Sequence, residues 1–406
     1  GTGNSLNGIF TPTDLHGLNL PRSLLKSHYN MPGPRVGFAW TPSKDQKTVV
    51  RGGYGIFYHW DNTNAENYRT NIPFTTSVSI YNTSLSNPAG GINRVFPPNL
   101  QAFDANNLYP SVQQWSFGVQ RELGAAFVLS TTYVGNHAVH LDQQPNLNQP
   151  QPNLAVATGS INVNTVRPYL GYGNITYDER NGSASYNALQ VVLNRRFSAG
   201  LFVQANYTWS RSIVWNFGQN PFVQPDEEGL NSYDQPQNFT FSFVYDLPFF
   251  KSRTGWMKTA LGGWEASGNA TFASGFPLTV TVSGDRAGVG GGTQRPNVVA
   301  PLVTTGDVFG YFNTAAFALE PLGTFGNEGS NILRGPGISD DINLNLYKNL
   351  LLGSEQRHLR IGAEFFNIFN HANFASVGTV YGSPTFGNLT GALDPRHIQL
   401  SAKLVF

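Results

Sequence analysis

Apolar and polar side chains alternate along several segments of the chain. In residues 201–210, LFVQANYTWS, every second residue from Leu201 to Trp209 is apolar, and the residues between them are Phe202 and amide or hydroxyl side chains. Successive side chains leave a strand on opposite faces, so this period of two predicts a β-strand with one apolar and one largely polar face. The same pattern recurs in four further segments, at residues 113–121, 238–247, 264–272 and 398–406.

More strands are predicted between these segments. Each predicted strand is near or above the roughly 9–11 residues that a tilted strand needs to cross a bilayer. With them the total is about eleven strands. The additional strands lie near residues 34–42, 48–60, 125–141, 184–197, 340–351 and 357–371.

The connections alternate between short and long. A soluble sandwich has no reason to keep all of its long loops at one end, whereas outer-membrane barrels have short periplasmic turns and long extracellular loops. The sequence therefore predicts an all-β fold, an antiparallel transmembrane β-barrel, in preference to a soluble all-β protein. Short turns are predicted at 43–47, 122–124, 198–200 and 353–356, with a somewhat longer one at 248–261. Long polar segments rich in Gly, Pro and Asn are predicted at 61–110, 142–183, 214–236, 276–339 and 372–394.

The composition agrees with a membrane barrel. Charged residues are only 12% of the chain, about half of the usual share of roughly 25%. Aromatic residues reach 13%, and several, such as Tyr133 and Trp209, fall near predicted strand ends, where aromatic girdles lie in barrels. No run of about 18 apolar residues is present, which argues against a transmembrane helix. The net charge of +1, without a basic patch, argues against a nucleic-acid partner.

The predicted topology leaves the barrel incomplete. If the short turns are periplasmic, the last strand ends at Phe406 in the periplasm, and the strand at 34–42 starts outside the cell. An odd strand number with an extracellular start does not fit the even-stranded rule of bacterial barrels. We therefore expect the 406 residues to be the C-terminal half of a barrel of about 22 strands. The alternative is a twelfth strand near residues 5–10, which would make a small complete barrel.

Several stretches of the chain form recognisable motifs: SVQQWSFGVQREL (111–123), SYNALQVVLNRRF (185–197), GGWEASGNATFASGFPLTV (262–280) and FFNIFNHANF (365–374). These stretches resemble the TonB-dependent receptors of Oar-like type. The resemblance extends over nearly the whole chain and implies the C-terminal part of a 22-stranded barrel. It also implies an N-terminal plug, a TonB box and often a carboxypeptidase regulatory-like domain in front. Plug, TonB box and signal peptide are absent from these residues, so we expect this part alone not to support active transport.

The resemblance also implies a function and partners. It implies a transporter in the outer membrane of a Gram-negative bacterium that takes up a large, scarce solute such as a metal chelate, saccharide or peptide. A surface adhesion or secretion-assisting role and a passive porin-like channel are the alternatives. The implied partners are outer-membrane lipid, the TonB complex through the N-terminal region, and a small-molecule or oligomeric ligand of unknown identity. The terminal Phe406, after alternating apolar residues, resembles the signal for the barrel-assembly machinery.

The loop at 214–236 holds the candidate ligand-contacting residues. Trp215 and Tyr233 are suited to an external aromatic platform, or to packing the loops over the barrel mouth. Asp226, Glu227 and Glu228 form the densest acidic cluster of the chain. Calcium or a cationic ligand is one interpretation, because hard cations bind several oxygens. A solvated loop tip is the favoured one.

Other polar residues fit structural roles. Arg360 and Glu364 share the predicted lumen face of the strand at 357–371, where charges can tune what passes, and a structural ion pair is the favoured role. The segment GVGGG at 288–292 lacks the following Lys-Ser/Thr of a phosphate-binding loop, so a flexible extracellular loop is expected. The chain has neither a Gly-x-Ser-x-Gly elbow nor an HExxH pair. We therefore expect no enzymatic activity, no cofactor and no resident metal.

Overall fold

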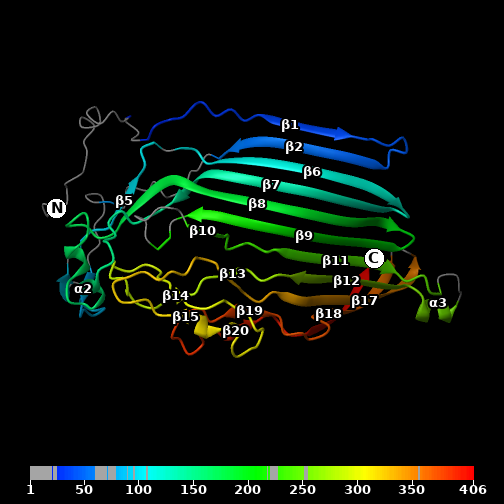
Figure 1. Cartoon of the computed structure of the whole chain (residues 1–406). Helices are drawn as coiled ribbons and strands as arrows, with labels where there is room; N and C mark the ends of the chain where they lie inside the picture. The colour runs from blue at the N-terminus through cyan, green and yellow to red at the C-terminus, as the bar shows by residue number, and fades with distance from the viewer. Residues whose placement is uncertain are drawn as a thin grey trace.

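Eleven strands lie side by side in one antiparallel sheet, in chain order (Figure 1). This number confirms the prediction of about eleven strands. They are β1 (Arg35–Trp40), β2 (Thr48–Tyr58), β6 (Ser111–Gly124), β7 (Phe127–Gln143), β8 (Ile175–Ser198), β9 (Leu201–Asn216), β11 (Gln237–Asp246), β12 (Trp264–Ala273), β17 (Ile338–Ser354), β18 (Arg357–Phe366) and β21 (His397–Val405). This computed structural model describes residues 21, 25–59, 71, 79–88, 90–94, 97–106, 108–216, 218–219, 227–250, 255–354 and 357–406. Within these ranges no helix has both the length and the apolar character needed to cross a membrane.

Shorter elements decorate the sheet. β5 (Leu100–Phe103) runs parallel to the start of β8, and β10 (Glu227–Leu230) pairs with the end of β9. The remaining short strands form four two-stranded pairs: β3 (Ser79–Tyr81) with β4 (Ile92–Arg94), β13 (Pro277–Leu278) with β16 (Leu333–Arg334), β14 (Asn297–Val298) with β15 (Phe317–Ala318), and β19 (Phe374–Val377) with β20 (Leu389–Ala392). The short helices are α2 (Leu154–Ala157), η3 (Val163–Thr165), α3 (Trp256–Leu261) and η4 (Thr314–Ala316).

The connections separate into two ends of the sheet. Short turns join β1 to β2, β6 to β7, β8 to β9 and β17 to β18 at what we call the turn end. Long segments connect the strands at the opposite end, the loop end (Figure 1). The predicted alternation of short and long connections is therefore confirmed. The longer turn expected at 248–261 contains the helix α3.

Strand register sorts the side chains into two faces. Phe241 of β11 lies opposite Ala205 of β9 and Ala270 of β12. One residue further, Ser242 lies opposite Gln204. Because side chains alternate along a strand, the sheet has an apolar face and a polar face, the two faces that the sequence predicts for lipid and lumen.

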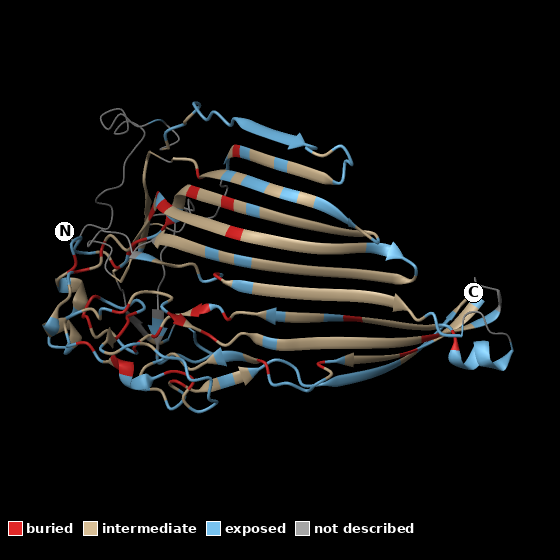
Figure 2. Cartoon of the chain, turned by 45° about the vertical axis from the view of Figure 1, so that its right-hand side comes forward, coloured by how far each residue is buried: buried red, intermediate tan, exposed pale blue. Residues whose placement is uncertain are grey.

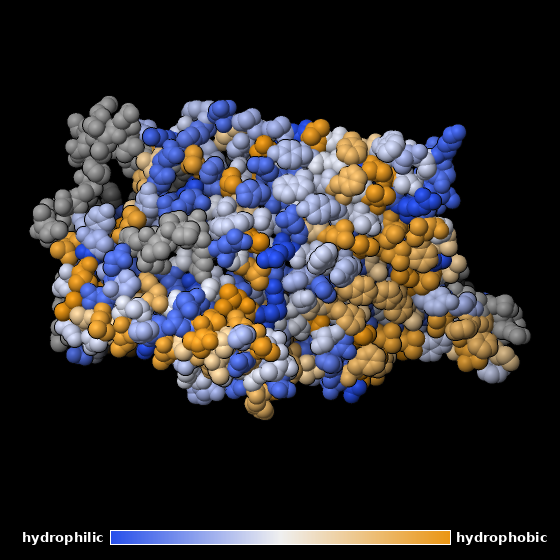
Figure 3. Space-filling model, in the orientation of Figure 1, coloured by the Kyte–Doolittle hydropathy of each residue, from blue (hydrophilic) through white to orange (hydrophobic). Residues whose placement is uncertain are grey.

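The apolar face is exposed rather than covered by other elements. Trp209 is 59% exposed, and Phe117 and Leu400 are also exposed. Apolar side chains gather over β9, β11 and β12 toward the turn end, as Figure 3 shows. A soluble monomer rarely exposes so large a continuous apolar surface, whereas a barrel presents one to lipid.

Glycines within the strands allow aromatic rings on neighbouring strands to lie flat on the sheet. Gly135 is paired with Trp115, and a Cβ at Gly135 would lie 2.4 Å from the indole ring. Gly52 is likewise paired with Phe38, and a Cβ at Gly52 would lie 2.5 Å from the Phe38 ring. Any larger residue at these positions would displace the ring, which accounts for glycine inside these strands.

Three strands extend further toward the loop end than predicted. β8 begins at Ile175 instead of near 184, and β7 and β9 continue to Gln143 and Asn216. The extensions of β7 and β8 are largely polar, so their sequence resembles a loop, whereas the extension of β9 includes Ile213, Val214 and Trp215. Backbone pairing nevertheless continues, and Asp142 of β7 lies opposite Arg180 of β8 with an ion pair of 3.0 Å. The interstrand ladder, rather than an apolar face, holds this part together.

The sheet is not closed among the described residues. β1 pairs only with β2, and β21 pairs only with β18. All residues of β1 are exposed. The twelfth strand considered near residues 5–10 lies outside the described residues. Within the described part, the sheet therefore has two edges and forms part of a barrel.

Candidate ligand site at the loop end

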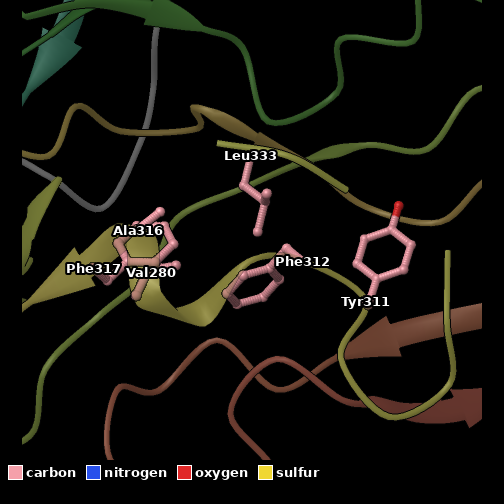
Figure 4. Close-up of a cluster of buried hydrophobic side chains, with 6 residues drawn as sticks. All are labelled: Val280, Tyr311, Phe312, Ala316, Phe317 and Leu333. Atoms are coloured by element: carbon pink, nitrogen blue, oxygen red, sulfur yellow. The ribbon is translucent and has the colours of Figure 1, made fainter. Parts of the chain in front are cut away.

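A cluster of buried apolar side chains lies at the loop end rather than in the sheet. Figure 2 shows that the buried residues gather there. Phe312 is near its centre, with ring centroids 5.7 Å from Phe317 and 5.3 Å from Phe386. Phe386 belongs to the loop at 372–394, so two long loops share one core. The buried members, shown in Figure 4, are Val280, Tyr311, Phe312, Ala316, Phe317 and Leu333.

A buried ion pair ties this loop core to the sheet. The Asp234 carboxylate, 1% exposed, accepts a hydrogen bond of 2.8 Å from the Arg334 guanidinium. It also accepts one of 2.6 Å from the backbone N–H of Ser212 in β9. Arg334 donates in addition to the carbonyl of Gly275. Because a buried charge must be paired, this contact fixes the connection after β10 against β9 and β16.

A polar pocket of about 460 Å³ opens at the loop end. Gln149 Nε2 donates to the carbonyl of Gln219 at 3.1 Å, and Gln219 Nε2 donates to the carbonyl of Gly326 at 3.0 Å. The lining carboxylate, Asp142, is paired with Arg180. The pocket is therefore lined by amide groups rather than by free charge. Gln219 and Gln294 use their amides in bonds to the protein, and the remaining amide groups suit hydroxyl or amide groups on a ligand. Its amide side chains are Gln143, Gln144, Asn146, Gln149, Gln219 and Gln294.

The Gly-rich segment at 288–292 contributes to the pocket wall as an ordered turn. The Asp285 carboxylate accepts hydrogen bonds from the N–H groups of Val289 at 2.9 Å and Gly290 at 2.7 Å, and from Gln294 Nε2 at 2.8 Å. Burial alone would raise the pKa of Asp285, but these hydrogen bonds outweigh it and hold the pKa below its ordinary value. Gly290 has a φ of 93°, which favours glycine. The carboxylate thus gives the segment that was expected to be a flexible loop a defined set of hydrogen bonds.

Replacing this carboxylate should release the turn. In Asp285→Ala, the loss of charge-assisted hydrogen bonds costs about 1.5–3 kcal/mol locally, so amide exchange at 288–292 should accelerate roughly tenfold or more. Because the folded pKa is depressed, the stabilisation is present above about pH 5 and is lost as pH falls through that pKa. Hydrogen exchange by mass spectrometry measures both effects. Asp307→Ala, at an exposed carboxylate of the same loop, is the control; equal acceleration in both variants would contradict the assignment.

The two candidate loop aromatics occupy different environments. Trp215 is half-buried in β9, with its ring 6.4 Å from that of His137 in a T-shaped contact. Its carbonyl accepts a hydrogen bond from Gln143, a pocket residue, at 3.0 Å. Tyr233 lies between β10 and β11 and is 82% exposed. Trp215 is thus joined to the pocket through Gln143, and no ring contact joins it to Tyr233 in the part of the chain that the structure describes.

The described members of the acidic cluster lie in a short strand. Asp226 lies outside the described residues. Glu227 and Glu228 begin β10, opposite Asn216 and Trp215 of β9, and Glu228 is exposed. No group of three His, Asp or Glu side chains in the described ranges could hold a metal ion. The sequence interpretation of a loop tip is corrected to a strand pairing for these two glutamates.

Arg360 and Glu364 belong to a network on the polar face. The Arg360 guanidinium pairs with Glu265 of β12 at 2.7 Å and lies 3.9 Å from the centroid of the Tyr347 ring. Tyr347 Oη donates to Glu364 at 2.8 Å. The two predicted charges are thus connected through Tyr347 of β17. Sequence reasoning missed Glu265 and Tyr347 as their partners, because only the strand register brings them together.

The terminal Phe406 follows β21 directly. It is 94% exposed, and it continues the alternation that places Leu404 and Leu400 on the apolar face. Its position is that of an accessible C-terminal residue at the edge strand. The sequence had predicted the alternation that leads up to it.

Comparison with known proteins identifies relatives. The model of a family described as outer membrane beta barrel domain matches residues 2–399. No curated protein matches the sequence. The solved outer membrane transporter YddB from Escherichia coli is similar with a TM-score of 0.51 at 10% identity, over 92% of this chain and 40% of that chain. The ferripyoverdine receptor of Pseudomonas aeruginosa, bound to ferripyoverdine, has a TM-score of 0.45 at 11% identity, over 92% of this chain and 33% of that chain.

The chain thus spans at most 40% of the length of these two solved chains. At 10% identity the similarity to YddB is one of fold. It agrees with the open sheet described above, which matches part of a larger barrel.

Proposed function

This chain belongs to the outer membrane beta barrel domain family, and from this premise we propose that it is the C-terminal part of the barrel of a TonB-dependent transporter for a large, scarce solute. The family is one of outer-membrane proteins, so the chain lies in the outer membrane of a Gram-negative cell. A membrane barrel, rather than a catalytic site, defines the family, which argues against an enzyme.

The open sheet of eleven strands carries this proposal. Unpaired backbone groups at a sheet edge are costly in lipid, so both edges need partner strands. Plugged outer-membrane transporters have barrels of about 22 strands. A barrel of that size would add about eleven strands, which would pair with both edges of this sheet. The similarity to YddB, which covers most of this chain but 40% of that transporter, supports the same arrangement.

The packed loop end supports solute capture. Two long loops share the core around Phe312, and the amide-lined pocket lies beside Trp215. We infer that this pocket contacts hydroxyl or amide groups of the solute. Saccharides, peptides and metal chelates all carry such groups, so the pocket does not select among these classes.

We further propose that an N-terminal region couples transport to energy and that the C-terminal residue directs assembly. A plug and a TonB box in front of residue 1 would close the barrel and connect it to the TonB complex. The exposed Phe406 would be read by the barrel-assembly machinery. The Arg360–Glu265 pair, with Tyr347 and Glu364, would stiffen the lumen wall.

Solute uptake by whole cells tests the proposal. Cells that express the full-length protein are offered a labelled ferric siderophore, an oligosaccharide and a peptide. Uptake of at least one of them should require the protein and should stop when TonB is deleted. An empty-vector strain is the control for other transporters.

Ion conductance separates the alternatives. In a planar bilayer the full-length transporter, closed by its plug, should show no steady open-channel current. Steady current together with TonB-independent uptake would favour a passive porin. Unchanged uptake of all three probes in a deletion strain, with weakened cell attachment, would favour a surface adhesion role.

A further inference from the structure

A groove of about 730 Å³ lies on the apolar face toward the loop end. Its floor comes from β7, β8 and β9, and its rim comes from the connection between β10 and β11. The register arranges the floor in two rows. Tyr133, Leu189 and Trp209 lie directly opposite one another in the first row. The second row lies two positions further along the strands toward the loop end, where Asn187 is paired with Arg211.

The first row marks the outer limit of the lipid-facing surface. On β9 the residues of the apolar face from Leu201 to Trp209 are all apolar, and Arg211 is the next residue on that face. These nine positions match the roughly 9–11 residues with which a tilted strand crosses the bilayer. Trp209 and Tyr133 are both exposed, as aromatic girdles at an interface are. The second row therefore lies at the level of the lipid headgroups.

The second row is polar and carries a free cation. Tyr133 Oη donates to Asn187 Oδ1 at 2.6 Å, which leaves the Asn187 amide NH₂ able to donate elsewhere. Arg211 is exposed, and its guanidinium forms no hydrogen bond or ion pair within the described residues. The other guanidinium of the groove, on Arg334, is neutralised by Asp234. The lining thus has a net positive charge where it meets the headgroups.

We propose that this groove binds one phosphorylated, anionic lipid of the outer leaflet. Its acyl chain lies along Tyr133, Leu189 and Trp209, and its phosphate accepts hydrogen bonds from Arg211 and Asn187. The groove is continuous with the surface that faces lipid. Along the strands its apolar row is followed by its cationic row, just as the acyl chain of such a lipid is followed by its phosphate. Arginine binds phosphate through a planar fork of donors. The inference rests on the family and on the assignment of the two faces, independently of the transported solute.

Lipid retention measured by native mass spectrometry tests the groove. The full-length protein in a zwitterionic detergent is titrated with purified lipid A, and one tightly retained lipid per protein is expected. Arg211→Gln should weaken retention about tenfold, the effect of losing one charge-assisted hydrogen bond. Trp209→Ala should weaken it as well, and Arg211→Lys should restore part of it.

Two controls make the result decisive. Arg121, on the same face but at the turn end, is bonded to Thr48 Oγ1, and Arg121→Gln should retain lipid A as the wild type does. Phosphatidylethanolamine and inorganic phosphate should bind more weakly than lipid A. Equal retention by Arg211→Gln and the wild type would overturn the proposal. Equal binding of inorganic phosphate would show a soluble-anion site instead.

Discussion

Arginine in place of Phe241 should lower the free energy of unfolding in a bilayer by about 2–4 kcal/mol, the cost of a charge on the lipid face near the midplane. Phe241 is near the middle of β11 and lies opposite Ala205 and Ala270, so small neighbours leave the new guanidinium facing hydrocarbon. The substitution also removes the contact with the Phe243 ring, 5.9 Å away. Denaturant titration of the full-length protein in phospholipid vesicles measures the effect.

The neighbouring residue supplies the matched control. Ser242 points to the polar face, opposite Gln204 and Asn269. Arginine there is hydrated in the lumen, so Ser242→Arg should cost less than about 1 kcal/mol. If the two variants lost equal stability, the assignment of the two faces would be wrong.

The strands were predictable because the apolar–polar period is local. Leu201 to Trp209 alternate within nine residues, and the lipid on one side and the lumen on the other impose that alternation directly. The extension of β8 to Ile175 was not predictable in this way. Its residues leave the bilayer, so no apolar face is needed, and only the ladder with β7 defines it.

The loop core was missed because its members are far apart in the chain. Phe312 and Phe386 contact each other across 74 positions of mostly polar sequence, and no short window shows their common burial. Asp285 was missed for another reason: the glycines at 288–292 indicate a loop equally well whether it is mobile or held by a carboxylate. The hydrogen bonds alone distinguish the two.

The candidate site was predictable in its residue types but not in its partners. Arg360 and Glu364 were recognised from their shared face, since residues four apart in a strand point the same way. Their actual contacts, Glu265 and Tyr347, depend on the order and register of β12, β17 and β18. Register is a property of the whole sheet, so a single strand cannot reveal it.

Residues 1–406 expressed alone should not form a closed barrel. β1 and β21 each have one unpaired side in the described sheet, and every unpaired N–H or C=O group in hydrocarbon costs several kcal/mol. No side chain can satisfy a whole edge. After refolding into vesicles, the chain should therefore remain protease-sensitive, and it should lack the heat-modifiable band on gels that marks a closed barrel. The full-length protein should instead resist protease and show the heat-modifiable band.

Cross-linking shows directly whether the two edges meet. The chain has no cysteine, so Phe38→Cys in β1 and Leu400→Cys in β21 create one defined pair on the apolar face. In residues 1–406 the two cysteines should stay reduced within a monomer under mild oxidation, because nothing pairs β1 with β21. A disulfide within a heat-modifiable monomer would mean that the edges close on each other. A barrel closed by the described strands alone would then replace the half-barrel, since strands that pair directly leave no edge for further strands to fill. Direct pairing would also contradict the small barrel with a twelfth strand near residues 5–10, because that strand would separate β1 from β21.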